Sequence, residues 1–209
     1  MPRAPDGGKC VEMKCPAAAQ NVAPRTGMNN RVVLLCGGLA ESTLISPYDN
    51  AARMARALDA TTFYITAPMF AETRPLRDAL VASKPIQGVL EMVSGLDLAL
   101  LSAIDLSEQS KALEYGVISR DTWQSLRDAG AVGDICGHYL DAQGTVIDHP
   151  LTSLVVNPAL KDLLRVPELV LAAGGVQKVA IIRSAIKAEL CHVLITDEDA
   201  ARALAQSGR

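Results

Sequence analysis

Short apolar segments alternate with helical segments along most of this chain, and this alternation constrains its fold more than any other feature. The segments are five or six residues long and rich in apolar or β-branched residues, and continuous apolar runs such as 169–173 are typical of parallel strands covered on both faces. The five segments are 32–36, 61–66, 96–101, 169–173 and 192–196. Segments with helical spacing lie between them, for example Tyr48–Leu58 and Arg120–Ala129. We therefore predict an α/β fold with a doubly wound, mostly parallel sheet.

The composition supports this fold class. Aromatic residues make up 3% of the chain and apolar residues 49%, so the core must consist of Leu, Val, Ile and Ala, which suits a parallel α/β sheet. The net charge of −3 gives no reason to expect a nucleic-acid surface on this chain. No apolar run reaches the length of a membrane span and the first residues lack a signal-peptide core, so we expect a cytoplasmic protein.

Two segments depart from the alternating pattern. Residues 1–30 have neither helical nor strand period and are rich in Pro, Gly and Ala, so we predict a poorly ordered extension before a single domain at 31–209. Ser119 is expected to cap the helix that follows it. Further along, Ile135–Asp141 and Thr145–Asp148 flank a short loop that contains glycine. This pattern predicts a small antiparallel hairpin inserted into the parallel fold.

The stretch 168–188 is the strongest candidate for a binding site. A strand-length apolar run ends at Gly174-Gly175, and a helix with Val179, Ile182 and Ile186 on one stripe follows. Lys178 falls in the first turn, where a cation opposes the helix dipole at a cost of about 0.3–1 kcal/mol, and no carboxylate lies in that turn. A phosphate or other anion would offset this cost. The alternative, a solvated lysine beside a glycine turn, stays open.

Ligands of doubly wound sheets bind beyond the carboxyl ends of the strands. That rule brings Gly37-Gly38, the loop after Leu101 and Gly174–Lys178 to one rim. The five cysteines are irregularly placed, and neither Cys136-Gly-His138 nor Cys191-His192 has a second pair at ligand spacing, so we expect no metal site and no cofactor. The three histidines are expected to be structural.

Five segments in this order resemble a known family. They are CGGLA (36–40), APMF (67–70), GAVGDICGHYLDAQGTVID (130–148), AAGGVQK (172–178) and HVLITDEDAARAL (192–204). Over residues 31–205 they resemble the C-terminal effector-binding domain of SorC-type transcriptional regulators, which are related to DeoR-like repressors. The resemblance implies a Rossmann-like fold related to ribose-5-phosphate isomerase and glucosamine-6-phosphate deaminase. It also implies a homo-oligomer that binds a phosphorylated sugar or related metabolite. Binding of this ligand would change the oligomer and its affinity for operator DNA.

The resemblance assigns roles to single residues. Lys178 matches a lysine that contacts phosphate or sugar oxygens, and Asp134 matches a carboxylate that accepts hydrogen bonds from sugar hydroxyls. The other residues assigned to the pocket are Gly37, Gly38, Ser46, Tyr115, Gly116, Gly174 and Gly175. From the residues alone, Asp134 could instead stabilise a turn after Gly133, and Gly37-Gly38 could be a plain strand-to-helix turn.

The chain also departs from the family pattern. Members begin with a DNA-binding helix-turn-helix, followed by a strand, a phosphate loop and a helix, and residues 1–30 match none of these. We therefore expect a domain truncated on its N-terminal side that does not itself bind nucleic acid. Cys36 replaces a polar or basic residue, and Ser102-Ala103-Ile104 replaces a turn that contains glycine.

We expect a ligand-binding domain without catalytic residues. One alternative is a sugar-phosphate isomerase or deaminase, which needs an acid and a base at the sugar and for which Asp134 is the candidate base. The other is a remnant that only oligomerises with full-length relatives through its apolar hairpin.

Overall fold

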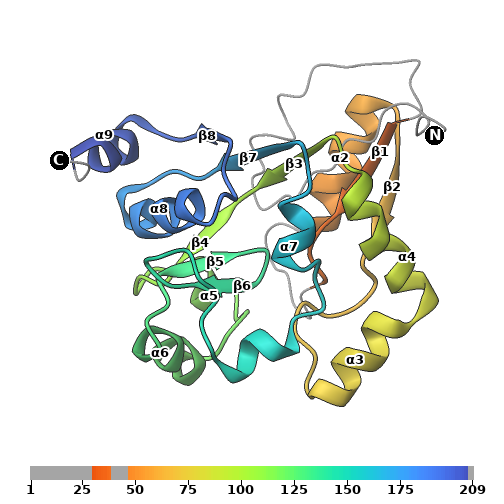
Figure 1. Cartoon of the computed structure of the whole chain (residues 1–209), viewed down its shortest axis with the longest axis horizontal. Helices are drawn as coiled ribbons and strands as arrows, with labels where there is room; N and C mark the ends of the chain where they lie inside the picture. Colours follow the sequence, from red (N-terminus) through yellow and green to blue (C-terminus); the bar gives the residue numbers. More distant parts are fainter. Residues whose placement is uncertain (1–29, 39–46, 207–209) are drawn as a thin grey trace.

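The computed structural model describes residues 30–38 and 47–206, without the side chains of 47–49, and has a layered α/β fold (Figure 1). The strands are β1 (Asn30–Leu34), β2 (Ala60–Tyr64), β3 (Leu98–Leu101), β4 (Ala103–Asp105), β5 (Gly133–Ile135), β6 (His138–Leu140), β7 (Glu168–Ala172) and β8 (Val193–Ile195). The α-helices are α2 (Pro47–Leu58), α3 (Arg74–Ala82), α4 (Lys84–Met92), α5 (Lys111–Glu114), α6 (Arg120–Asp128), α7 (Leu160–Leu163), α8 (Val179–Lys187) and α9 (Glu198–Gln206). Short 3-10 turns are formed by Val93–Gly95, Pro150–Leu154 and Val176–Lys178.

The five predicted parallel strands are all present, with ends shifted by a few residues. β1 pairs with β2, and β7 pairs with β3 on one side and β8 on the other, always in parallel. The β1–β2 pair and the β3–β7–β8 group contribute to the same two hydrophobic clusters. Val33 packs in one cluster with Leu101 and Leu171, and Val32 packs with Leu100 in the other cluster, which also contains residues of α2. The mostly parallel, doubly wound fold class is therefore confirmed.

The antiparallel insertion is larger than the predicted hairpin and turns at a different place. β4, β5 and β6 form a three-stranded antiparallel sheet, which lies below the parallel strands in Figure 1. The single strand predicted over Ile135–Asp141 is wrong, because the chain reverses at Cys136-Gly137, where φ is 52° and 78°. The predicted loop at 142–144 does reverse the chain, but only an isolated bridge joins Leu140 to Val146 beside it. A cysteine in the left-handed region is uncommon, so no residue pattern predicted the first turn.

Two of the predicted helix features can be compared directly. Ser119 caps α6 as expected, since its Oγ accepts a hydrogen bond from the Thr122 amide at 3.1 Å. The predicted apolar stripe of α8 is partly wrong: Ile186 is 46% exposed, whereas Ile181 and Ile182 are fully buried. The reason is tertiary, because Ile181 fills the space left by Gly133 of β5, where an added Cβ would meet the Ile181 Cβ at 2.7 Å.

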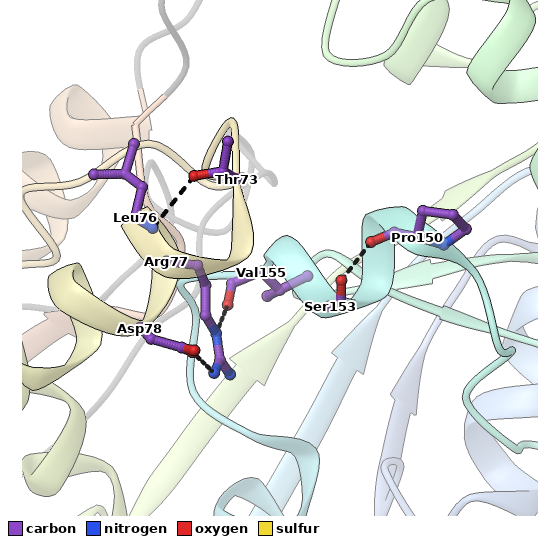
Figure 2. Close-up of polar contacts among 7 residues, drawn as sticks. All are labelled: Thr73, Leu76, Arg77, Asp78, Pro150, Ser153 and Val155. Atoms are coloured by element: carbon purple, nitrogen blue, oxygen red, sulfur yellow. Dashed lines mark hydrogen bonds and ion pairs between the residues drawn. The ribbon is translucent and has the colours of Figure 1, made fainter.

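Residues 154–157 run alongside residues 69–71 and are hydrogen-bonded to them through the backbone. The Ala71 amide donates to Leu154 O at 2.9 Å, and the Val156 amide donates to Met69 O at 3.0 Å. Figure 2 shows Arg77 of α3 donating from Nε to Val155 O, at 3.1 Å, while its Nη1 contacts Asp78. These hydrogen bonds thus fix the backbone that leads to Asn157.

β1 begins at Asn30, the last residue of the segment that the sequence assigned to an extension. Residues 1–29 lie outside the described residues, so the division of the chain at 30/31 stays a prediction. Within the described ranges, no helix is long and apolar enough to cross a membrane.

Gly133 offers a test of the contact between α8 and the antiparallel sheet. An alanine Cβ there would come within 2.4 Å of Ile104 O and 2.7 Å of Ile181 Cβ, so Gly133→Ala should lower the free energy of unfolding by about 1–3 kcal/mol. Gly88→Ala is the control, because a Cβ at this exposed position in α4 meets no atom within 4 Å. That substitution should stabilise the protein by about 0.5–1 kcal/mol. Urea denaturation measures both, and equal effects would contradict the packing described.

Candidate functional site

The carboxyl end of β1 is tied to the antiparallel sheet by one side chain. Asn157 Oδ1 accepts a hydrogen bond from the Gly37 amide at 2.8 Å, and its Nδ2 donates to Cys136 O at 2.7 Å. Asn157 is 7% exposed, so both hydrogen bonds are shielded from water. Asn157 is not among the residues predicted from the sequence, although this side chain brings the predicted site residue Gly37 next to the turn that follows Asp134.

Gly37 and Gly38 extend the pairing of β1 with the chain after β2. The Gly38 amide donates to Ala67 O at 2.8 Å, and the Met69 amide donates to Gly38 O at 3.1 Å. A Cβ at Gly37 would approach Ala67 O within 2.6 Å, which real Cβ atoms do not tolerate. The first glycine is therefore required by close approach of two backbones, which is a structural reason for this residue, and a role of Gly37 and Gly38 in ligand binding stays a prediction.

Asp134 is the central residue of β5 and is 3% exposed. It lies between Ile104 of β4 and Tyr139 of β6 in the strand register. Its Oδ2 accepts a hydrogen bond from the Gly137 amide at 2.7 Å, so it does stabilise a turn, as the structural alternative held. Burial and the nearby Asp134 carboxylate raise the pKa of Tyr139 above its usual value, so this phenol stays neutral. The turn occupies one of the two carboxylate oxygens.

The glycine turn after β7 already has a carboxylate partner. Gly175 has a φ of 96°, and its amide donates to Asp197 Oδ2, while Asp197 Oδ1 accepts from the Ala200 amide at 2.9 Å. These amides of Ala200 and Gly175 hold the pKa of Asp197 below its usual value. The sequence showed Asp197 as an acid at the start of the last helix but gave no sign that it reaches a turn 22 residues earlier.

Lys178 is half-buried and ends the 3-10 turn that precedes α8. This turn contacts β4 and α9, so Lys178 lies on an element that packs against the antiparallel sheet. Ser46 lies outside the described residues. Tyr115 and Gly116 follow α5, where Tyr115 is 39% exposed and its ring lies 5.4 Å from Lys111 Nζ. The hydrogen bonds of Asn157 and Asp134 join Gly37 to the turn at Cys136-Gly137, but they do not involve Tyr115 or Gly116.

Each histidine is engaged by the backbone. His138 Nε2 lies 2.8 Å from Pro158 O, His149 Nδ1 accepts from the Leu151 amide at 3.1 Å, and His192 Nδ1 accepts from the Leu169 amide at 3.1 Å. The structural roles expected for them are confirmed by these contacts. In the part of the chain that the structure describes, no three His, Cys, Asp or Glu side chains are grouped so that they could hold a metal ion.

The whole described domain matches a known family. Residues 14–206 match the Sugar-bind family model, described as "Putative sugar-binding domain". The chain belongs to this family. It is 29% identical over 191 residues to the erythritol catabolism regulatory protein EryD of Brucella abortus, covering 90% of this chain and 60% of the relative. It is 27% identical over 188 residues to the deoxyribonucleoside regulator of Bacillus subtilis, covering 89% of this chain and 59% of the relative.

Solved structures share the fold. The full-length sorbitol operon regulator SorC of Klebsiella pneumoniae superimposes with a TM-score of 0.87 at 17% identity, covering 96% of this chain and 66% of that one. A sugar-binding domain of a transcriptional repressor from Vibrio fischeri gives 0.83 at 24% identity, covering 96% and 79%. The resemblance to SorC-type and DeoR-like regulators is confirmed. The relatives from Brucella abortus and Bacillus subtilis are named as regulators rather than as isomerases or deaminases.

Removal of the Asn157 amide should loosen the site and the fold together. Asn157→Ala leaves the buried Gly37 N–H and Cys136 C=O without this partner, and each unpaired group costs about 1–3 kcal/mol, so the expected loss of stability is roughly 2–4 kcal/mol. Gln87→Ala, which deletes an exposed amide that donates to Glu91, is the control and should change stability by less than about 0.5 kcal/mol. Denaturant titration distinguishes them, and a neutral Asn157→Ala would contradict the assignment.

Proposed function

We propose that this domain binds a phosphorylated sugar as the effector of a transcriptional regulator. Membership in a family of sugar-binding domains supports the sugar, and the names of the relatives support the regulatory role. The observation that carries the proposal is the arrangement at one end of the sheet. A buried carboxylate, Asp134, lies on the antiparallel sheet, and the 3-10 turn that ends at Lys178 packs against β4 of that sheet.

The two groups have the chemistry that a sugar phosphate requires. A phosphate is held by a cation near the start of a helix, the role we propose for Lys178 beside the Gly174-Gly175 turn. Sugar hydroxyls donate hydrogen bonds to a carboxylate, the role we propose for Asp134. Gly37 and Gly38 border the same end of the sheet, and we retain Ser46, Tyr115 and Gly116 as further candidates.

The relatives indicate which ligands to try first. Two of them are named for erythritol catabolism and for deoxyribonucleosides, so small polyol and pentose derivatives head the panel. The chain spans about 60% of the length of these relatives. We propose that the domain acts in the cytoplasm as a homo-oligomer, does not contact nucleic acid itself, and transmits ligand binding to the operator affinity of the regulator that contains it.

Thermal stability in the presence of sugar phosphates tests the function. A ligand at 100 times its Kd should add about 2.7 kcal/mol to the free energy of unfolding and raise the melting temperature. Lys178→Ala should weaken binding of a phosphorylated ligand by roughly 10–100-fold, because a charge-assisted contact contributes about 1.5–3 kcal/mol. The control is Lys187→Ala at the far end of α8, which removes a lysine whose Nζ donates to Ala142 O, and this variant should bind normally. Retained binding by Lys178→Ala would exclude the anion role.

Asp197 provides a second test of where the phosphate lies. Its carboxylate accepts the Gly175 amide, so it places a negative charge at the turn proposed to receive an anion. Asp197→Asn removes that charge but leaves a carbonyl oxygen that can accept the same amide. Isothermal titration calorimetry should show equal or tighter binding of a phosphorylated ligand by this variant. Weaker binding would place the phosphate elsewhere.

A further inference from the structure

Three buried side-chain polar atoms without hydrogen-bond partners lie near the carboxyl ends of the parallel strands. In the described residues, five buried side-chain polar atoms lack a partner, whereas buried polar groups are normally satisfied. Ser102 Oγ follows the carboxyl end of β3, Thr196 Oγ1 follows that of β8, and Asn50 Nδ2 belongs to the start of α2. The other two, Ser107 Oγ and Trp123 Nε1, lie beyond β4 and in α6. Ligands of such sheets bind beyond the carboxyl ends of the parallel strands, which is where the first three atoms lie.

Ser102 is the residue through which the chain passes from the parallel into the antiparallel sheet, and it is 7% exposed. Leu101 and Ala103, its neighbours, both pack in the core cluster that contains α8 residues. Side chains alternate between the two faces of an extended chain, so the Ser102 hydroxyl points to the opposite face.

Asp134 points to that same face. Ile104 pairs with Asp134 in the register of β4 and β5, and Ile104 and Ser102 are two residues apart on one extended segment. Ser102 is therefore a diagonal neighbour of Asp134, at a backbone separation of about 7–8 Å. The register therefore places the serine hydroxyl and the carboxylate on one face, close enough for a single ligand to contact both.

The glycine turn and α2 border the same place. Leu101 pairs with Leu171 of β7, so Ser102 lies beside the residues that lead into Gly174. On the other side, α2 packs Met54 in the same cluster as Leu100, and Asn50 lies one helical turn before Met54. Because α2 joins two parallel strands, it runs antiparallel to them and begins at their carboxyl ends. Asn50 and Ser102 thus belong to one side of the sheet.

We propose that Ser102 is a specificity-determining contact that, together with Asp134, holds hydroxyl groups of the bound sugar. A serine hydroxyl both donates and accepts, whereas an ionised carboxylate only accepts, so the pair matches a ligand with neighbouring hydroxyls, which are donors and acceptors at once. The inference rests on the proposed function and adds the hydroxyl-reading residue to it. The ligand class is a polyol or an open or cyclic sugar.

The energetics distinguish this role from a structural one. A buried hydroxyl without a partner destabilises the ligand-free protein, and the ligand supplies the missing hydrogen bond. Ser102→Ala should therefore leave the melting temperature of the ligand-free protein unchanged or raise it, while it weakens ligand binding. A hydroxyl needed for the fold would have the opposite signature, with a lower melting temperature and retained affinity.

Isothermal titration calorimetry on the whole chain tests the proposal. The probes are ribose 5-phosphate, 2-deoxyribose 5-phosphate, erythrose 4-phosphate, glucosamine 6-phosphate and inorganic phosphate. For a sugar phosphate that the wild type binds, Ser102→Ala should raise Kd about tenfold, the effect of one lost hydrogen bond. Ser107→Ala is the matched control, since it deletes another buried hydroxyl without a partner, beyond β4, and its Kd should stay within twofold of the wild type.

The outcomes separate the two proposals. If the wild type binds no sugar phosphate, both the proposed function and the role of Ser102 are overturned. If the wild type binds and Ser102→Ala binds within twofold of it, the function stands and only the Ser102 assignment is overturned. A ligand-free Ser102→Ala that melts several degrees below the wild type also overturns it, because the hydroxyl would then be part of the fold.

Discussion

The candidate site depends on two hydrogen bonds made by a single buried amide. Asn157 accepts a hydrogen bond from the Gly37 N–H and donates one to the Cys136 C=O in a place shielded from water. A side chain can do this only if its own backbone is fixed. The pairing of Val156 with Met69 and the contact of Arg77 with Val155 O provide that support. The end of the first parallel strand and the antiparallel turn are therefore positioned by a segment that is distant from both along the chain.

The change from parallel to antiparallel strands lies next to the candidate residues Asp134 and Ser102. β3 ends at Leu101, β4 starts at Ala103, and one residue separates a sheet buried on both faces from a sheet that covers α6. Asp134 of β5 lies between Ile104 of β4 and Tyr139 of β6, both of which are buried. A carboxylate buried among apolar neighbours is costly unless hydrogen bonds compensate it, and the Gly137 amide does so in part.

Local signals in the sequence predicted the fold well. Short segments rich in apolar or β-branched residues predicted the five parallel strands. The cap at Ser119 was predicted because it involves two residues that are three apart in the sequence. The failures concern contacts between distant segments. The buried face of α8 is set by the space at Gly133, the turn at Cys136 uses a residue that rarely takes positive φ, and Asn157 acts across 120 residues. Periodicity and propensity contain no information about such partners, since these depend on how the segments pack.

The charge arrangement at the glycine turn follows from the same long-range packing. From the sequence, Lys178 stood alone at a helix start, and an external anion was the simplest way to offset it. In the structure, the Gly175 amide already donates to the carboxylate of Asp197, whose pKa is lowered by that contact and by the Ala200 amide. A negative group therefore occupies part of the turn before any ligand arrives. A phosphate can bind there only with enough attraction from Lys178 and other donors to overcome repulsion from Asp197, whereas an uncharged polyol meets no such barrier. For the phosphorylated ligand that we propose, the balance between the charges of Lys178 and Asp197, rather than the glycine turn itself, sets how much the phosphate adds to the affinity.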